Sequence, residues 1–271
     1  MNTKKLRLAL VGKDVSKSKS EEIHKFILSK MGAECEYENF SVSSDGFDSV
    51  MRTLMGDFDG FNVTIPYKRD VMGYLSEVVG DALDFGAVNT VLTASEKGYN
   101  TDGAGFMLML QAENIEVKNK KILVLGGGGA GRSTAVALKK AGAHVAMYQR
   151  TRADLLETCA EIGVAPADSA EEGGYDILIN CTGVGMHDSE GGSPVTSKAF
   201  RNAQTAIDLI YEPKKSKFLQ LAENEGLKIV NGSAMLFYQA YFADCLYLGA
   251  EPNLAQAIAF YAEYQTQRKQ P

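Results

Sequence analysis

A glycine-rich turn follows a short apolar run in the middle of the chain. Residues 122–125 are all aliphatic, as in a strand buried on both faces, and Gly126, Gly128 and Gly131 follow at the spacing of a dinucleotide-binding turn. The chain then has a helical pattern from Gly131, so the free N–H groups at the helix start would face the phosphates. We therefore predict a dinucleotide site here; the alternative is a flexible glycine-rich loop.

The residues after the next expected strand indicate which dinucleotide would bind. A protein that binds NAD usually has Asp or Glu there, which accepts from the ribose hydroxyls. This chain has Gln149, Arg150, Thr151 and Arg152 instead. Arginines can pair with a phosphate on the ribose, and the helix dipole does not favour a basic helix start. The sequence therefore predicts NADP.

Two serines near the N-terminus have a structural and a functional interpretation. Ser18 and Glu21 have the spacing of a capping box before a helix whose apolar stripe begins at Ile23. Ser18 and Ser20 also supply two hydroxyls at a helix start, which suits an anionic group.

A polar strand face and a lone aspartate also have both a structural and a functional interpretation. Strand alternation in residues 60–65 places Asn62 and Thr64 on one face, and Lys68 lies just beyond Pro66. That face could meet solvent or form the wall of a site. Asp102 precedes an apolar run, where an ordinary helix N-cap is expected.

The histidines and cysteines form no catalytic or metal-ligand pattern in the sequence. No histidine has a Ser, Cys or carboxylate context that indicates nucleophilic catalysis, so each is interpreted as structural or solvated, and the scattered cysteines as free thiols without a metal. If a hydride is transferred here, a lysine can manage the alcohol proton: its ammonium stabilises an alkoxide and its amine accepts a proton. The residues concerned are His24, His144, His187, Cys35, Cys159, Cys181 and Cys245.

Composition narrows the class of protein. A chain of 271 residues with 45% hydrophobic and 23% charged residues is expected to form one large or two modest globular domains. The net charge of −6 argues against a nucleic-acid partner. No segment approaches membrane-spanning length, and the apolar run 6–11 is too short for a signal peptide, so we expect a cytoplasmic protein.

The expected elements change in type near residue 104. The first part has strands at 6–11 and 36–42, a helix at 47–55 and a hairpin that ends at Asp102. From Lys121, strands and helices alternate, which predicts an α/β fold with a doubly wound parallel sheet. Strands are expected near 122–126, 144–148, 176–180, 205–210 and 227–230, and helices at 235–248 and 254–264.

Over nearly its whole length the chain resembles the shikimate dehydrogenases. The resemblance rests on many motifs in the family's order. They are residues 60–68, 86–90 and 99–103, the glycine turn, Gln149 to Thr151, residues 180–186 and 208–213, Gly232 to Leu236, and Gln239 with Ala240.

The resemblance implies an architecture and a reaction. The expected domains are a substrate domain over 1–103, a Rossmann-type NADP domain over 104–233 and C-terminal helices over 234–271 that return to the substrate domain, with a central cleft. The expected reaction is the reversible, NADP-dependent interconversion of shikimate and 3-dehydroshikimate, by a monomer or homodimer.

The resemblance also implies roles for individual residues. Lys68 and Asp102 match the catalytic pair. Positions that match substrate-binding residues are Ser18, Ser20, Thr64, Asn89, Tyr211 and Gln239. Positions that match cofactor-binding residues are Gly126, Gly127, Gly128, Gly129, Ala130, Gly131, Gln149, Arg150, Thr151, Arg152 and Gly232.

Four positions depart from the family's usual pattern. Lys17 stands where the family has His, and Glu21 where it has Pro. Ser233 and Ala234 stand in a segment that usually reads Gly-Leu-Gly-Met-Leu. The alternatives are therefore the same chemistry on quinate or an amino-substituted analogue and, in another class, a non-catalytic NADP-binding regulator. Retention of both Lys68 and Asp102 argues against the regulator, which needs no proton-transfer pair.

Overall fold

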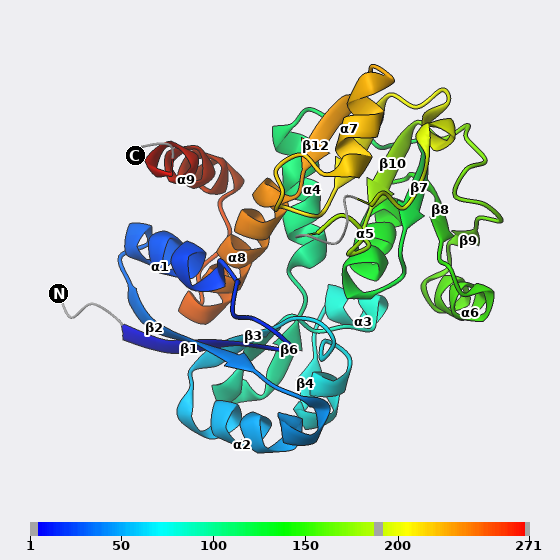
Figure 1. Cartoon of the computed structure of the whole chain (residues 1–271). Helices are drawn as coiled ribbons and strands as arrows, with labels where there is room; N and C mark the ends of the chain where they lie inside the picture. The colour runs from blue at the N-terminus through cyan, green and yellow to red at the C-terminus, as the bar shows by residue number, and fades with distance from the viewer. Residues whose placement is uncertain (1–4, 187–191, 269–271) are drawn as a thin grey trace. The chain divides into compact units, whose positions relative to one another are not determined.

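A computed structural model describes residues 5–186 and 192–268, so His187 lies outside the described residues. The chain forms two compact units (Figure 1). The first unit runs to Gly105 and resumes at Phe237, and the second unit is Phe106–Leu236. From the sequence, we expected the two boundaries between these units after residues 103 and 233.

The first unit contains a mixed six-stranded sheet in the order β2-β1-β3-β5-β6-β4. Strand β1 pairs in parallel with both β2 and β3, whereas β5 is antiparallel to β3 and β6, which confirms the expected hairpin. The strands are β1 (Lys5–Gly12), β2 (Glu34–Ser41), β3 (Gly60–Val63), β4 (Glu77–Val78), β5 (Thr90–Leu92) and β6 (Lys97–Tyr99).

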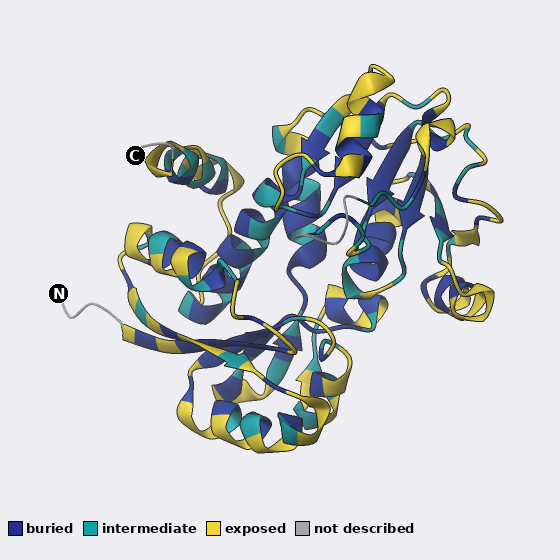
Figure 2. Cartoon of the chain, in the orientation of Figure 1, coloured by how far each residue is buried: buried dark blue, intermediate teal, exposed yellow. Residues whose placement is uncertain are grey.

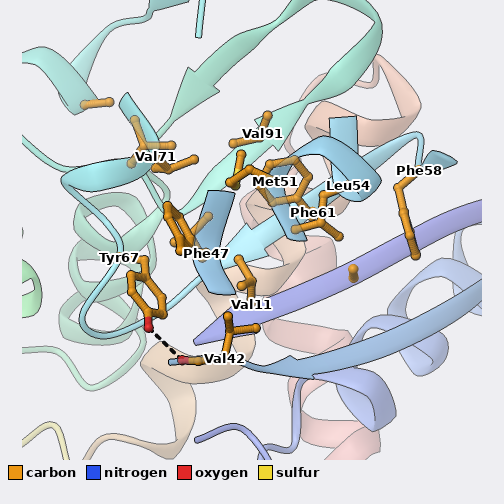
Figure 3. Packing of buried hydrophobic residues seen from close by; sticks show 14 residues of the cluster. Val11, Val42, Phe47, Met51, Leu54, Phe58, Phe61, Tyr67, Val71 and Val91 are labelled. Carbon is orange, nitrogen blue, oxygen red and sulfur yellow. Dashed lines mark hydrogen bonds between the residues drawn. The ribbon is translucent and has the colours of Figure 1, made fainter. Parts of the chain in front are cut away.

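Helices cover both faces of this sheet, because β1 is apolar on both sides. Leu8 and Leu10 belong to one buried cluster, which also includes Leu28 of helix α1 (Ser20–Lys30) and Tyr247 of helix α8 (Ser233–Leu248). The alternate residue Val11 packs on the other face with helix α2 (Phe47–Asp57), whose Phe47, Met51 and Leu54 fill the cluster in Figure 3. Polar side chains on the α1 and α8 face are therefore buried and need partners.

Three further helices belong wholly or partly to this unit. Helix α3 covers Asp81–Phe85, α4 covers Asp102–Ala112 and starts in this unit, and α9 covers Leu254–Gln267. Asn253 caps the start of α9, because its side chain accepts from the backbone N–H of Gln256 at 3.0 Å. Short 3₁₀ turns lie at Ser44–Gly46, Asp70–Tyr74 and Thr93–Ser95.

The strand that carries Asn62 is shorter than its sequence pattern indicates. Strand β3 ends at Val63, although the alternation runs to residue 65, and the side chain of Ile65 is 64% exposed. Asn62 itself is buried at 5% exposure. The solvent interpretation of this polar face is therefore wrong for Asn62.

The second unit is the expected doubly wound α/β sheet. Its six strands are all parallel, in the order β12-β11-β10-β7-β8-β9. The two-residue edge strand β9 was not expected, because so short a run has no periodicity. The strands are β7 (Lys121–Leu125), β8 (His144–Tyr148), β9 (Ala165–Pro166), β10 (Ile177–Asn180), β11 (Thr205–Asp208) and β12 (Lys228–Asn231).

Helices pack on both faces of this sheet as well, and Figure 2 shows its central strands buried. Helix α5 (Gly129–Lys140) contacts β7 and β8, and α6 (Arg152–Ile162) contacts α5. Helix α7 (Lys217–Asn224) packs Phe218 and Leu219 against Leu123 of β7 and Leu178 of β10. Among the described residues, none of the helices has the length and apolar character needed to cross a bilayer.

Candidate active site

The serine loop does not form the expected capping box. Lys19 is the N-cap residue of α1, and no side chain caps that end of the helix. Instead the Ser18 hydroxyl donates to the Ser20 hydroxyl at 3.0 Å and accepts from the Ser20 backbone N–H at 3.2 Å. The capping interpretation is therefore wrong, and the two hydroxyls lie beside each other at the start of α1.

Lys68 and Asp102 form an ion pair, although they lie far apart in the sequence. The Lys68 Nζ donates to the Asp102 Oδ2 at 2.6 Å, and the two side chains are 14% and 7% exposed. The backbone of Lys68 is held because its carbonyl accepts from the Val88 N–H at 2.8 Å. Asp102 is the first residue of α4, and the side chain of Asn100 accepts from its backbone N–H at 2.9 Å. The Asp102 carboxylate itself pairs with other side chains.

Asn89 connects this ion pair to its surroundings. Its Nδ2 donates to the Asp102 Oδ1 at 2.8 Å and lies 3.4 Å from the Gln239 Oε1 of α8. Its Oδ1 accepts from the Thr101 backbone N–H and from the Thr90 hydroxyl, each at 2.9 Å. The side-chain amide is therefore fixed at both ends, and one oxygen of Asp102 is held by a neutral donor while the other is held by an ammonium.

Four of the predicted site residues thus meet in one cluster: Lys68, Asp102, Asn89 and Gln239. Thr64 lies just beyond β3, with its backbone N–H bonded to the Val11 carbonyl at 2.9 Å. Tyr211 belongs to the second unit, in the loop after β11, where burial and then the charge of Glu212 raise the pKa of its phenol.

The glycine turn of the second unit has the geometry that a pyrophosphate requires. Gly126 has φ of +100°, in the left-handed region. A Cβ on Gly131 would lie 2.0 Å from the Gly126 carbonyl oxygen, so only glycine lets α5 pack this close to the turn. A Cβ on Gly128 would meet nothing within 4 Å, which leaves open space before the first turn of α5. The helix begins at Gly129, ahead of the expected Gly131. These residues fit a bound dinucleotide phosphate.

The polar residues of the segment after β8 differ in their contacts and exposure. Gln149 lies against Gly127, and its Nε2 donates to the Thr158 hydroxyl at 3.2 Å. Arg150 is exposed. Arg152 is paired with Asp168 at 2.9 Å, so its guanidinium is already engaged. Arg150 is therefore the better candidate for a ribose phosphate. Thr151 is the N-cap residue of α6.

Sequence reasoning missed the residues that hold this segment. Arg132 of α5 is only 6% exposed, forms an ion pair with Glu161 and donates to the Thr158 hydroxyl at 3.2 Å. Gln149 and Arg132 thus share Thr158. An arginine on an otherwise small and apolar helix stretch was the available signal.

Gly232, between β12 and α8, lies against the Leu209 backbone, where a Cβ would be 2.2 Å from the carbonyl oxygen.

A second buried carboxylate holds the ends of two neighbouring strands. The Asp208 Oδ1 at the end of β11 accepts from the Asn180 side chain at the end of β10 and from the Ile210 N–H, each at 3.0 Å. Its other oxygen accepts from the Ser216 hydroxyl. Burial raises the pKa of Asp208 to about 6, against the lowering effect of these three donors.

His24 is not an isolated structural histidine. Its Nδ1 lies 2.6 Å from the Asp244 Oδ1, and both side chains are buried. Burial raises the pKa of Asp244 to about 6, and the neighbouring His24 opposes that shift. Nothing in the sequence indicated this partner, because Asp244 comes from α8, which is remote in sequence from α1. Among the described residues, no group of three or more His, Cys, Asp or Glu side chains could hold a metal ion.

An α/β protein with a dinucleotide-binding turn and a buried lysine–carboxylate pair belongs to the class of nucleotide-dependent dehydrogenases. Residues 10–91 match the shikimate dehydrogenase substrate binding domain. Curated relatives named shikimate dehydrogenase (NADP(+)) are 36% identical in Clostridium botulinum strain Hall and in Thermus thermophilus. The matches cover 86% and 92% of this chain, and 93% and 94% of the relatives. The chain belongs to the shikimate dehydrogenase family.

A solved structure agrees in fold. The crystal structure of shikimate 5-dehydrogenase from Thermus thermophilus, in complex with NADP(H) and shikimate, has a TM-score of 0.87 and 34% sequence identity. The match covers 95% of this chain and 99% of that chain. The expected α/β fold class is therefore confirmed.

The raised pKa of Asp208 predicts a pH dependence of stability. Because the folded protein holds this proton more tightly than the unfolded chain, whose Asp pKa is about 3.9, stability from this group is present at low pH and lost as pH rises through about 6. Replacing Asp208 by Asn removes the titration. We expect the stability of Asp208→Asn relative to the unchanged protein to rise by about 1–3 kcal/mol between pH 4.5 and pH 7.5.

Urea unfolding of both proteins at the two pH values measures this change. Asp244 titrates in both proteins, so its contribution cancels in the comparison. A difference that stays constant, or that falls as pH rises, contradicts the assignment to Asp208.

Proposed function

We propose that this chain is an NADP-dependent shikimate dehydrogenase, which reversibly reduces 3-dehydroshikimate to shikimate. The observation that carries the proposal is the buried Lys68–Asp102 pair, held by Asn89, in a chain of this family. The substrate is a small molecule. We also propose a cytoplasmic monomer or homodimer without a nucleic-acid partner, in keeping with the acidic net charge of −6.

The second unit supplies the residues that would hold the cofactor. The turn from Gly126 to Gly131 and the first N–H groups of α5 bind the pyrophosphate, and the exposed Arg150 pairs with the ribose phosphate. NADP, when bound, takes up the hydride that leaves the alcohol carbon or returns it to the ketone.

Lys68 and Asp102 manage the proton of the reacting oxygen. During oxidation the alcohol O–H gives its proton to the Lys68 amine while the carbonyl forms; during reduction the Lys68 ammonium gives that proton back. Asp102 holds the lysine Nζ at 2.6 Å, and the ammonium in this place stabilises negative charge on the oxygen. Asn89 fixes the second carboxylate oxygen, so Asp102 cannot rotate away from the lysine.

The remaining polar groups of the site bind the substrate. Ser18 and Ser20 present adjacent hydroxyls at the start of α1, where a carboxylate is favoured. We propose that Thr64, Asn89, Tyr211 and Gln239 bind the ring hydroxyls.

Residues next to the two serines and at the start of α8 depart from the family's usual pattern, which gives a second candidate substrate. Lys17 and Glu21 flank the two serines, and Ser233 and Ala234 stand at the start of α8. Quinate or an amino-substituted shikimate is therefore the alternative substrate for the same chemistry. Absorbance at 340 nm with shikimate and quinate, each with NADP and NAD, decides between these and a non-catalytic regulator, which would turn over neither.

Cofactor preference follows from Arg150. A charge-assisted arginine–phosphate contact contributes about 1.5–3 kcal/mol, so NADP is expected to be preferred over NAD by at least about tenfold in kcat/KM. Arg150→Ala is expected to erode this preference mainly through the KM of NADP. The exposed Arg201 lies in the same unit outside the proposed site, so Arg201→Ala serves as the control. Equal kcat/KM with both cofactors in the unchanged protein contradicts the assignment.

The serine pair predicts a change in substrate affinity. Changing Ser18 and Ser20 together to Ala removes two donors to the substrate carboxylate, so the KM for shikimate is expected to rise at least about tenfold. The KM for NADP is expected to stay within about twofold, because the cofactor residues lie in the other unit. A variant that loses only melting temperature, with both KM values unchanged, shows that the serines have a structural role.

The catalytic pair predicts a loss of kcat. Lys68→Ala is expected to lower kcat by about 10²–10⁴-fold, the usual cost of a lost acid–base group, with little change in the KM for shikimate. Asp102→Asn is expected to be similarly severe, and the double variant little worse than the worse single one, because groups that act as a unit are non-additive.

Steady-state kinetics on the three variants, with melting curves to verify the fold, tests this pair. Near-normal kcat in Lys68→Ala rejects its role outright. Losses that add fully in the double variant mean instead that Lys68 and Asp102 act independently.

A further inference from the structure

A continuous chain of hydrogen bonds joins the Tyr37 hydroxyl to the Asp102 carboxylate through the interior of the first unit. The Tyr37 hydroxyl on β2 donates to the Asn62 Oδ1 on β3 at 3.0 Å. The Asn62 Nδ2 lies 3.3 Å from the Thr90 hydroxyl on β5 and 3.4 Å from the Asn89 carbonyl. Thr90 then donates to Asn89, the residue that holds Asp102.

The bonds along this chain are donated in one direction. Tyr37 donates to Asn62, Asn62 to Thr90, Thr90 to Asn89 and Asn89 to Asp102. The series ends on a carboxylate, the strongest acceptor in it. Hydrogen bonds arranged head to tail in a buried environment polarise one another, so losing one weakens those that follow.

Tyr37 is the first donor of this chain, and its ring is held by neighbouring side chains. It is 5% exposed, and its ring stacks on the His24 ring with centroids 5.0 Å apart and an interplanar angle of 17°. Asp244 fixes the His24 ring from the other side through the 2.6 Å contact to Nδ1. Burial raises the pKa of the Tyr37 phenol, so the hydroxyl keeps its proton and remains a donor to Asn62.

We propose that Tyr37 is a positioning residue for the reaction: through Asn62, Thr90 and Asn89 it fixes the Asp102 carboxylate. This inference rests on the proposed function and extends it to three residues outside the proposed binding and catalytic set, Tyr37, Asn62 and Thr90.

The variant Tyr37→Phe tests the proposal, because it removes one hydroxyl and keeps the stacked ring. We expect kcat with shikimate to fall about tenfold, since misplacing a reacting group by 1 Å can cost up to about 10²-fold. The KM for shikimate is expected to rise severalfold, and the KM for NADP to stay unchanged.

The matched control is Tyr264→Phe. Tyr264 is also 5% exposed in the first unit, and its hydroxyl donates to Glu22 at 2.8 Å, outside the chain of bonds. Both variants are expected to lose some melting temperature, but only Tyr37→Phe to lose kcat. Equal kcat in Tyr37→Phe and the unchanged protein overturns the proposal and assigns Tyr37 to packing alone.

A second measurement uses no substrate. The side-chain amide signal of Asn89 in a ¹⁵N spectrum, assigned by its loss in Asn89→Ala, reports the network directly. We expect it to shift in Tyr37→Phe and to stay in place in Tyr264→Phe. An unmoved signal overturns the proposal even where kcat falls. If the unchanged protein does not turn over shikimate, the proposed function fails, and this signal still decides whether Tyr37 positions the Asn89–Asp102 cluster.

A double variant tests whether the effect travels along this chain. Asn62→Ala removes the next member, so Tyr37→Phe combined with Asn62→Ala is expected to lower kcat no further than Asn62→Ala alone. Losses that multiply in the double variant show two separate effects and overturn the shared chain.

Discussion

The arrangement of side chains in the first unit depends on one buried negative charge, the carboxylate of Asp102. A carboxylate with 7% exposure is costly unless it is paired and hydrogen-bonded, and Asp102 meets that requirement with Lys68 on one oxygen and Asn89 on the other. Each partner must then be held in turn. Lys68 is tied by its backbone to Val88, and Asn89 by its side chain to Thr90 and Thr101. The hydrogen bonds that fix the proposed proton-transfer pair are therefore the same ones that make its burial tolerable.

The second unit places its buried carboxylate in a different environment. Within the described part of the chain, Asp208 accepts from three neutral donors, and burial raises its pKa to about 6. Its work is to tie the end of β11 to the end of β10, at the carboxyl edge where parallel sheets place their ligands. The two buried carboxylates therefore differ in their donors: Asp102, in the proposed site, has an ammonium beside it, whereas Asp208, which joins two strands, does not. This difference is visible only once the donors around each oxygen are known.

Local patterns predicted much of this arrangement. The aliphatic run before Gly126 and the alternation after Lys121 predicted the parallel sheet, because a strand buried on both faces leaves a continuous apolar signature. The roles of Lys68 and Asp102 came from the family resemblance, since nothing in either segment refers to the other. The predicted capping box is absent because the Ser18 hydroxyl bonds to Ser20 instead. His24 and Asp244 could not be paired in advance, because their contact exists only when α1 and α8 pack on the same sheet face.

The first unit is assembled from two separate stretches of chain, with the second unit between them. Tyr247 and Ala243 of α8 fill the same cluster as Leu6 and Leu8 of β1. On the ribosome, the first strand therefore emerges long before the residues that cover it, whereas Phe106–Leu236 is contiguous and can complete its own core earlier. Until α8 is released, α1 alone covers one face of the nascent N-terminal sheet, and Asp244 cannot reach His24. A chain whose synthesis stops before α8 would leave this apolar face open to chaperones.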